Sequence, residues 1–97
     1  MTPFSDAQLL ALHRELVATP SLSGQEGPLA EHLRGWLAAH GVVAERFGDN
    51  LVAHFGAPPL FGLNTHLDTV PPCAGWSRDP HAVAVDDGRV IGLGSND

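Results

Sequence analysis

The chain has 97 residues and a mass of 10.2 kDa, and five arginines, no lysine and eleven acidic residues give it a formal net charge of −6 at pH 7. This length fits one domain at most, and an acidic balance without a basic run argues against a nucleic-acid partner, because neutralising phosphates needs clustered Lys and Arg. The lone Cys73 excludes an intrachain disulfide and suits a reducing cytoplasm, and no stretch reaches the roughly 20 apolar residues of a membrane-spanning helix.

Two amphipathic helices are predicted before residue 42. Residues 5–8 (Ser-Asp-Ala-Gln) have the pattern of a capping box, leucines follow at helical spacing, and Pro20 ends this helix near Ala18. A second capping box at residues 23–26 precedes an apolar helical stripe, which Gly41 closes as a C-terminal cap.

Strand patterns follow the helices. The run 60–66 is mostly apolar, as expected of a strand buried in the centre of a sheet. Asp86-Asp87-Gly88 is a favourable hairpin turn. The predicted strands are residues 42–47, 51–55, 60–66, 82–85 and 89–91. This order predicts an α/β fold in which two helices pack on a mixed sheet.

The last residues form a Gly-rich turn after the final predicted strand. Nothing beyond residues 89–91 closes a hydrophobic core. We therefore expect the chain to be the first part of a longer protein; a complete small α+β domain is the alternative.

His66 and Asp68 directly follow the apolar run. Strand periodicity places them on one face, about 6.6 Å apart along the strand. A neutral imidazole binds metal ions, and a carboxylate that accepts its other ring N–H fixes the tautomer. A His and an Asp at this spacing are usually a solvated pair in a loop, so the spacing alone marks a candidate metal site and no more.

Asp97 is the second candidate, behind the small residues Gly92, Gly94 and Ser95. Small residues let the backbone approach a ligand closely. An Asx turn or a helix N-cap is the alternative role for an aspartate in such a turn. A phosphate loop is a poor match, because the third glycine and the lysine are missing.

The remaining reactive side chains lack such patterns. We expect His13 and His32 to be exposed on their helices and His40 to cap a helix end. Cys73 has no adjacent base in the sequence, and Trp76 is interpreted as a packed anchor of its loop.

Four segments together resemble the M20 family of zinc-dependent amidohydrolases and peptidases. They are residues 19–26 (TPSLSGQE), 64–71 (NTHLDTVP), 75–80 (GWSRDP) and 87–97 (DGRVIGLGSND). They keep the family's order and spacing over nearly the whole chain. Gly-Leu-Gly before Ser95-Asn96-Asp97 is most similar to the acetylornithine (acetylcitrulline) deacetylase branch.

The resemblance implies roles for the candidate residues. His66 matches a ligand of one zinc ion, Asp68 the carboxylate that orients this imidazole, and Asp97 the aspartate that bridges two zinc ions. Co²⁺ or Mn²⁺ also suit these donors. The family's general-base glutamate and its remaining ligands lie beyond Asp97. The implied fold is the N-terminal portion of a three-layer α/β/α catalytic domain.

The implied function is metal-dependent hydrolysis of the amide bond of a small N-acyl amino acid in the cytoplasm, as part of amino-acid biosynthesis. It belongs to the full-length protein, and the 97 residues alone are expected to be inactive. A dipeptidase, a carboxypeptidase, a succinyl-diaminopimelate desuccinylase or a non-catalytic fragment are the alternatives. The resemblance leaves open a homodimer through a domain outside these residues.

Overall fold

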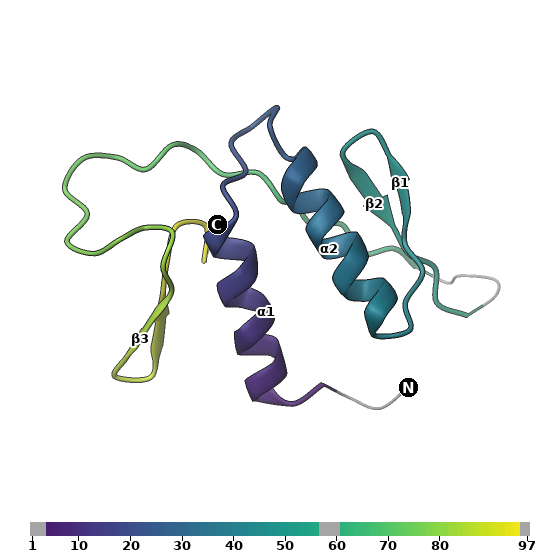
Figure 1. The fold of residues 1–97 in the computed structure, drawn as a ribbon, viewed down its shortest axis with the longest axis horizontal. Coiled ribbons are helices and arrows are strands. Elements are labelled where there is room, and N and C mark those ends of the chain that lie inside the picture. Colours follow the sequence, from purple (N-terminus) through teal and green to yellow (C-terminus); the bar gives the residue numbers. More distant parts are fainter. Residues whose placement is uncertain (1–3, 57–60, 96–97) are drawn as a thin grey trace.

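The computed structural model describes residues 4–56 and 61–95. Two helices lie between two small antiparallel hairpins, one at either side of the chain (Figure 1). None of the helices in the described ranges combines the length and the apolar character that crossing a bilayer requires. The elements are α1 (Asp6–Ala18), α2 (Gly27–Ala39), β1 (Glu45–Phe47), β2 (Asn50–Val52), β3 (Ala84–Asp86) and β4 (Arg89–Ile91).

Helix α1 begins and ends where its sequence predicts. The Ser5 Oγ accepts from the Gln8 N–H at 3.1 Å, and the Ser5 N–H donates to Gln8 Oε1 at 2.8 Å. These bonds form the predicted capping box and satisfy two N–H groups near the helix start. At the other end, the Thr19 hydroxyl donates to the Glu15 carbonyl at 3.0 Å.

Helix α2 starts differently from the prediction. Glu26 is its N-cap residue and its side chain does not cap the helix. The Glu26 carboxylate instead accepts from the Gly24 N–H at 2.8 Å, and the Ser23 hydroxyl donates to Asp68. The predicted capping box at residues 23–26 is therefore wrong, because a distant carboxylate takes the serine hydroxyl.

The C-terminal end of α2 is a Schellman motif. Gly41 has φ +82°, its N–H donates to the Ala38 carbonyl at 3.2 Å, and the Val42 N–H donates to the Leu37 carbonyl at 2.9 Å. A glycine adopts this left-handed conformation without steric cost, so the predicted cap at Gly41 is confirmed.

Both hairpins turn through two residues. β1 and β2 are joined by Gly48–Asp49, and β3 and β4 by Asp87–Gly88. Asp87 (φ 51°) and Gly88 (φ 73°) are both left-handed, which a type I′ turn requires. The predicted hairpin turn at residues 86–88 is thus confirmed. β4 has the predicted bounds 89–91, and β3 covers residues 84–86 in place of the predicted 82–85. β1 and β2 are shorter than the strands predicted at 42–47 and 51–55.

The predicted central strand at residues 60–66 is wrong for the part that the structure describes. Residues 61–66 belong to no strand, and Phe61 and Leu63 are 79% and 93% exposed. An apolar run becomes a central strand only where ladder partners lie on both sides, and the two described sheets have two strands each. The coarse α/β class agrees with the structure, whereas one mixed sheet does not.

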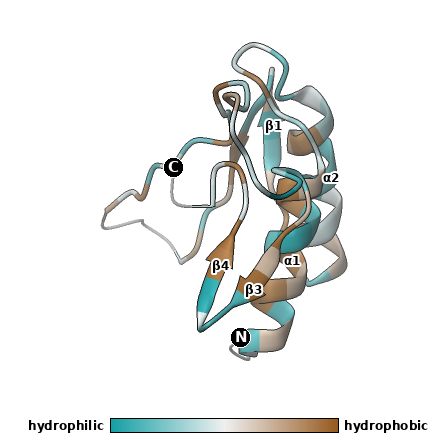
Figure 2. Cartoon of the chain, turned by 90° about the vertical axis from the view of Figure 1, so that its left-hand side faces the viewer, coloured by the Kyte–Doolittle hydropathy of each residue, from teal (hydrophilic) through white to brown (hydrophobic). Residues whose placement is uncertain are grey.

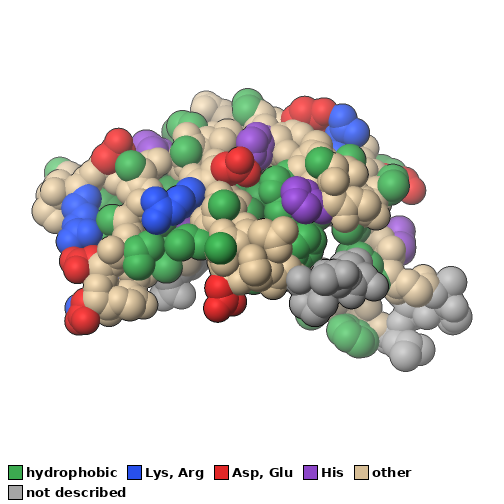
Figure 3. All heavy atoms as spheres, turned by 60° about the horizontal axis from the view of Figure 1, so that its bottom comes forward, with side chains coloured by type: hydrophobic (Ala, Val, Ile, Leu, Met, Phe, Trp, Pro, Cys, Tyr) green, Lys and Arg blue, Asp and Glu red, His purple; other side chains and the backbone are tan. Residues whose placement is uncertain are grey.

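The core is small and much apolar surface is open. The accessible area of 7044 Å² exceeds the roughly 5,300 Å² of a compact chain of this mass. Hydrophobic atoms are open to solvent across the face in Figure 3. The buried apolar residues are Val17, Leu29, Ala30, Val42 and Ala44, and exposed large ones include Leu9, Val43, Phe47, Phe55, Val70 and Val85.

The segment after β4 packs closely on α1. A Cβ at Gly92 would lie 3.0 Å from Val17 Cγ1 and 3.4 Å from Val83 Cγ2. Apolar parts of α1 and of the β3–β4 hairpin lie side by side there (Figure 2). The absence of a side chain at Gly92 thus allows the backbone to approach α1 closely.

An exposed ionic network ties α2 to the first hairpin. Glu31 forms an ion pair with Arg34 on the same helix and accepts from Arg46 Nη1 of β1 at 3.2 Å. Arg46 also contacts Asp49 Oδ1 at 3.0 Å. The hydrogen bond from Arg34, and then that from Arg46, lower the pKa of Glu31 to about 2.

Replacing Gly92 with alanine is expected to destabilise the fold by about 1–3 kcal/mol, because the Val17 side chain must move to admit the methyl group. Thermal unfolding followed by circular dichroism measures the loss. Gly62→Ala is the matched control, since a Cβ there meets nothing within 4 Å. A Gly92→Ala variant as stable as that control would contradict the packing.

Replacing Glu31 with glutamine is expected to lower the Tm at pH 7 but not near pH 2. The pKa of Glu31 is lowered in the folded state, so its contribution is present above the ordinary value of 4.5 and is lost as the pH falls towards about 2. Glu45→Gln is the control on the neighbouring strand. A Tm difference that persists unchanged at pH 2 would exclude this network as its source.

Candidate metal centre

The structure brings His66 and Asp68 into contact within an extended segment, not on a strand. His66 Nδ1 lies 3.1 Å from Asp68 Oδ1 and 3.1 Å from the Asp68 carbonyl oxygen. An ionised carboxylate and a carbonyl only accept hydrogen bonds, so Nδ1 carries the proton. In the neutral form of the ring this tautomer has its lone pair on Nε2, the nitrogen through which an imidazole so oriented binds a metal ion.

The Asp68 carboxylate is held from a second side. The Ser23 hydroxyl donates to its Oδ2 at 2.5 Å. This hydrogen bond is the largest cause of a lowered pKa of Asp68, with a smaller contribution from His66 and against an opposing effect of desolvation. Asp68 is therefore an ionised acceptor at neutral pH, as the tautomer of His66 requires.

A backbone clamp fixes the same segment to the loop between α1 and α2. The buried Ser21 donates from its Oγ to the Leu67 carbonyl at 2.8 Å, and its own carbonyl accepts from the Thr69 N–H at 2.8 Å. Leu22 and Thr69 form an isolated parallel bridge. Sequence reasoning missed these contacts, because nothing in residues 19–26 alone indicates which distant segment they meet.

Asp97, the second predicted ligand, lies outside the described residues. The turn before it is tethered to α1, because the Ser95 hydroxyl contacts His13 Nε2 at 2.8 Å and donates to the Val90 carbonyl at 3.3 Å. His13 is partly buried by this contact, so the prediction that it is exposed is wrong.

The other reactive side chains named from the sequence lie outside the His66–Asp68 pair, in helix α2, at its C-terminal end or in a loop. His40 is the C-cap residue of α2, as predicted, and its ring stacks on Trp36 with centroids 3.9 Å apart. His32 is exposed, as predicted, and lies 3.5 Å from Glu15 Oε2. Cys73 is an exposed free thiol.

The described residues fit part of a metal centre. Within residues 4–56 and 61–95, no three side chains of His, Cys, Asp or Glu gather as a metal-holding group. A catalytic zinc ion takes three protein ligands and an open position. The oriented imidazole of His66 suits one of these positions, and the remaining ones need residues other than those described.

A hollow of about 880 Å³ adjoins the pair. This volume falls within the range of pockets that take small molecules. Its walls come from α2, from the first hairpin and from the segment that carries His66. The lining residues are Glu26, Leu33, Phe47, Asp49, Asn50, Leu51, Val52, Asn64, Thr65, His66, Leu67 and Asp68.

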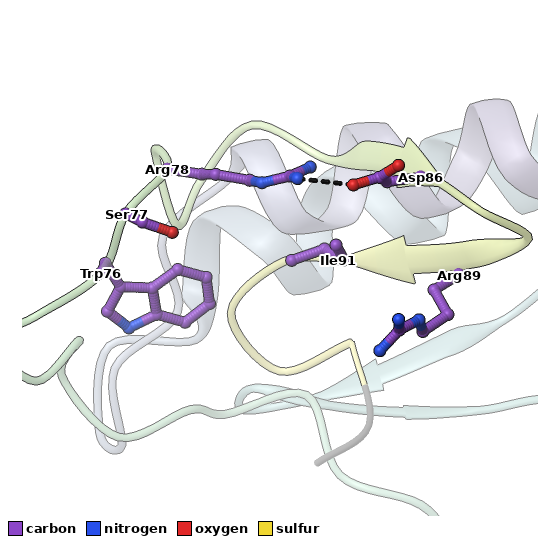
Figure 4. A pocket seen from close by; sticks show the side chains of 6 residues that line it. All are labelled: Trp76, Ser77, Arg78, Asp86, Arg89 and Ile91. Carbon is purple, nitrogen blue, oxygen red and sulfur yellow. Dashed lines mark hydrogen bonds and ion pairs between the residues drawn. The ribbon is translucent and has the colours of Figure 1, made fainter.

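A second hollow of about 310 Å³ lies beside the β3–β4 hairpin (Figure 4). The half-buried Trp76 forms one wall, and Arg78 Nη2 donates to Asp86 Oδ2 at 2.7 Å along another. The guanidinium of Arg89 and the indole of Trp76 both point into it. It shares no lining residue with the hollow beside His66.

Curated relatives align with most of this chain. It is 41% identical over 101 residues to the succinyl-diaminopimelate desuccinylase of Rhodospirillum rubrum, an alignment that covers 94% of this chain and 26% of that enzyme. These 97 residues are homologous to the N-terminal part of M20-type deacetylases and desuccinylases. The expected M20 resemblance is thereby confirmed.

Two further relatives belong to the deacetylase side of this family. The chain is 39% identical to the acetylornithine deacetylase of Edwardsiella ictaluri, over 91% of this chain and 27% of that enzyme. It is 38% identical to the N-acetyl-L-citrulline deacetylase of Xanthomonas campestris, over 77% of this chain and 21% of that enzyme. The chain thus spans about a quarter of the length of the relatives it matches. No family model and no solved structure matches it.

Proposed function

We propose that the protein containing these 97 residues hydrolyses the amide bond of an N-acyl amino acid at a metal centre. The observation that carries the proposal is the contact of His66 Nδ1 with the Asp68 carboxylate at 3.1 Å, which presents Nε2 as a ligand. The names of the relatives support the substrate class, because each describes removal of an acyl group from an amino-acid amine.

The chain's own residues bind and orient in this reaction. His66 would hold the metal ion through Nε2, while Asp68 would accept the hydrogen bond from Nδ1–H and keep the ring in place. Asp97 would be the second ligand, in the bridging role that the resemblance implies. Zn²⁺ suits imidazole and carboxylate donors, and Co²⁺ or Mn²⁺ are the alternatives. Such an ion, when bound, would supply a water with a pKa near 7 and a Lewis acid for the acyl carbonyl.

The 97 residues alone are expected to bind Zn²⁺ weakly and to show no hydrolysis, because the described residues contain no three-ligand group. Release of ornithine from N-acetylornithine, measured with added Zn²⁺, checks this. His66→Ala is the control for background hydrolysis. Turnover above that control would show that this chain alone builds a working centre.

In the full-length protein, Asp68→Ala is expected to lower kcat/KM by about 10–100-fold, the usual effect of losing a carboxylate that orients a metal-binding histidine. Steady-state kinetics with the acyl amino acid measure the loss. Glu45→Ala removes an exposed carboxylate of β1 and serves as the matched control. Kinetics equal to those of the control would remove Asp68 from the site.

A desuccinylase is the second candidate, and the 41% identity to the Rhodospirillum rubrum enzyme favours it. Gly92-Leu93-Gly94 favours the acetylornithine deacetylase branch instead. The ratio of kcat/KM for N-acetylornithine and N-succinyl-diaminopimelate, measured with one preparation, decides between them. A preference for a dipeptide over these two substrates would identify a peptidase instead. A metal-loaded protein that hydrolyses neither acyl amino acid nor the dipeptide would be a non-catalytic relative.

A further inference from the structure

Ser23, His66 and Asp68 form one hydrogen-bonded chain. The Ser23 hydroxyl donates to Asp68 Oδ2 at 2.5 Å, and Asp68 Oδ1 accepts from His66 Nδ1 at 3.1 Å. The two carboxylate oxygens thus have different donors on opposite sides. Rotation of the carboxylate would break both bonds at once, so each donor restrains the position of the other.

The backbone around Ser23 aims its hydroxyl at this carboxylate. The Gln25 N–H donates to the Leu22 carbonyl at 2.7 Å, which closes a turn over Ser23 and Gly24. Gly24 has φ +86°, as the third residue of a type II turn requires. Ser23 therefore occupies a fixed corner of a tight turn and not a freely moving loop.

The clamp at Ser21 sets the distance between this turn and the candidate site. Ser21 binds the Leu67 carbonyl and the Thr69 N–H, which are the two neighbours of Asp68 in the chain. The hydroxyl of Ser23 plays no part in capping α2, whose N-cap residue is Glu26. Its described partner is the Asp68 carboxylate, 45 residues away in the sequence.

We infer that Ser23 is a positioning residue of the proposed metal centre: it orients His66 for metal binding by holding the Asp68 carboxylate. The inference rests on the proposed function for its catalytic consequence. The opening motif Ser21-Leu22-Ser23-Gly24 then has a chemical purpose, since Ser21 fixes the segment and Ser23 fixes the carboxylate.

The direct test measures the tautomer of His66 in the full-length protein after removal of metal by a chelator. Histidine ¹⁵N NMR, recorded at a pH at which the ¹⁵N shifts themselves show the ring to be neutral, distinguishes the two forms. We expect the unmodified protein to hold the Nδ1–H form and Ser23→Ala to lose much of that preference. Ser23→Thr, which keeps the hydroxyl, is expected to restore it.

Ser77→Ala removes an exposed hydroxyl elsewhere and is the matched control. An Nδ1–H population in Ser23→Ala equal to that of the control would overturn the inference. Retention of the far-ultraviolet circular dichroism spectrum ensures that the variants compared are folded. If Ser23→Ala fails to fold, Ser23→Thr and Ser23→Cys are compared instead. The thiol of Cys is a weaker donor than the hydroxyl of Thr, so a smaller Nδ1–H population in Ser23→Cys than in Ser23→Thr supports the inference, and equal populations would overturn it.

The catalytic consequence is tested with a double-mutant cycle. Ser23→Ala is expected to lower kcat/KM about fivefold, less than the loss of Asp68, because water can replace the hydroxyl at this partly exposed carboxylate. In an Asp68→Ala background the same change is expected to have no further effect. An equal loss in both backgrounds would overturn the action through Asp68.

The two measurements separate this inference from the proposed function. Absence of metal-dependent turnover in the unmodified protein would overturn the proposed function and the catalytic half of the inference. The tautomer measurement in the metal-free protein needs no turnover, so it still decides whether Ser23 orients His66.

Discussion

The docking of the loop between the helices onto residues 67–69 is the contact on which the candidate site depends. Residues 61–66 belong to no strand, and the segment that carries His66 is joined to the loop by an isolated bridge between Thr69 and Leu22, so the strand geometry that the sequence suggests is not what holds it. Hydrogen bonds from Ser21 and Ser23 hold it instead, across 45 or 46 positions of sequence. The orientation of the His66 ring is thus a property of two segments and not of one motif.

Local signals in the sequence predict the parts of the fold that local interactions build. The capping box at Ser5 and the left-handed turn at Gly88 satisfy backbone groups within a few residues, so α1 and the second hairpin are predictable. Ser23 has the same capping pattern, yet its hydroxyl serves a distant carboxylate. The strand prediction for residues 60–66 is wrong over the described part for a related reason. Apolar character alone cannot supply the neighbouring strands that a buried strand needs.

For the candidate site too, the sequence predicts contacts between residues that are close in the chain and not those between distant segments. His66 and Asp68 are close in sequence and meet in the structure, although through an extended loop and not through a shared strand face. The contribution of Ser23 depends on how two distant segments dock, and no periodicity encodes that. Asp97 and the three-layer fold remain predictions from resemblance, and the relatives support the deacylase chemistry through names that belong to chains about four times as long.

The open apolar face has a calorimetric consequence. Heat capacity rises on unfolding because apolar groups become newly hydrated, by about 12–15 cal/mol/K per residue in compact domains. Side chains such as Phe61 and Leu63 are already hydrated in the folded chain, at 79% and 93% exposure, and add little to that increment. The 97 residues therefore have a flatter dependence of unfolding free energy on temperature than their length suggests.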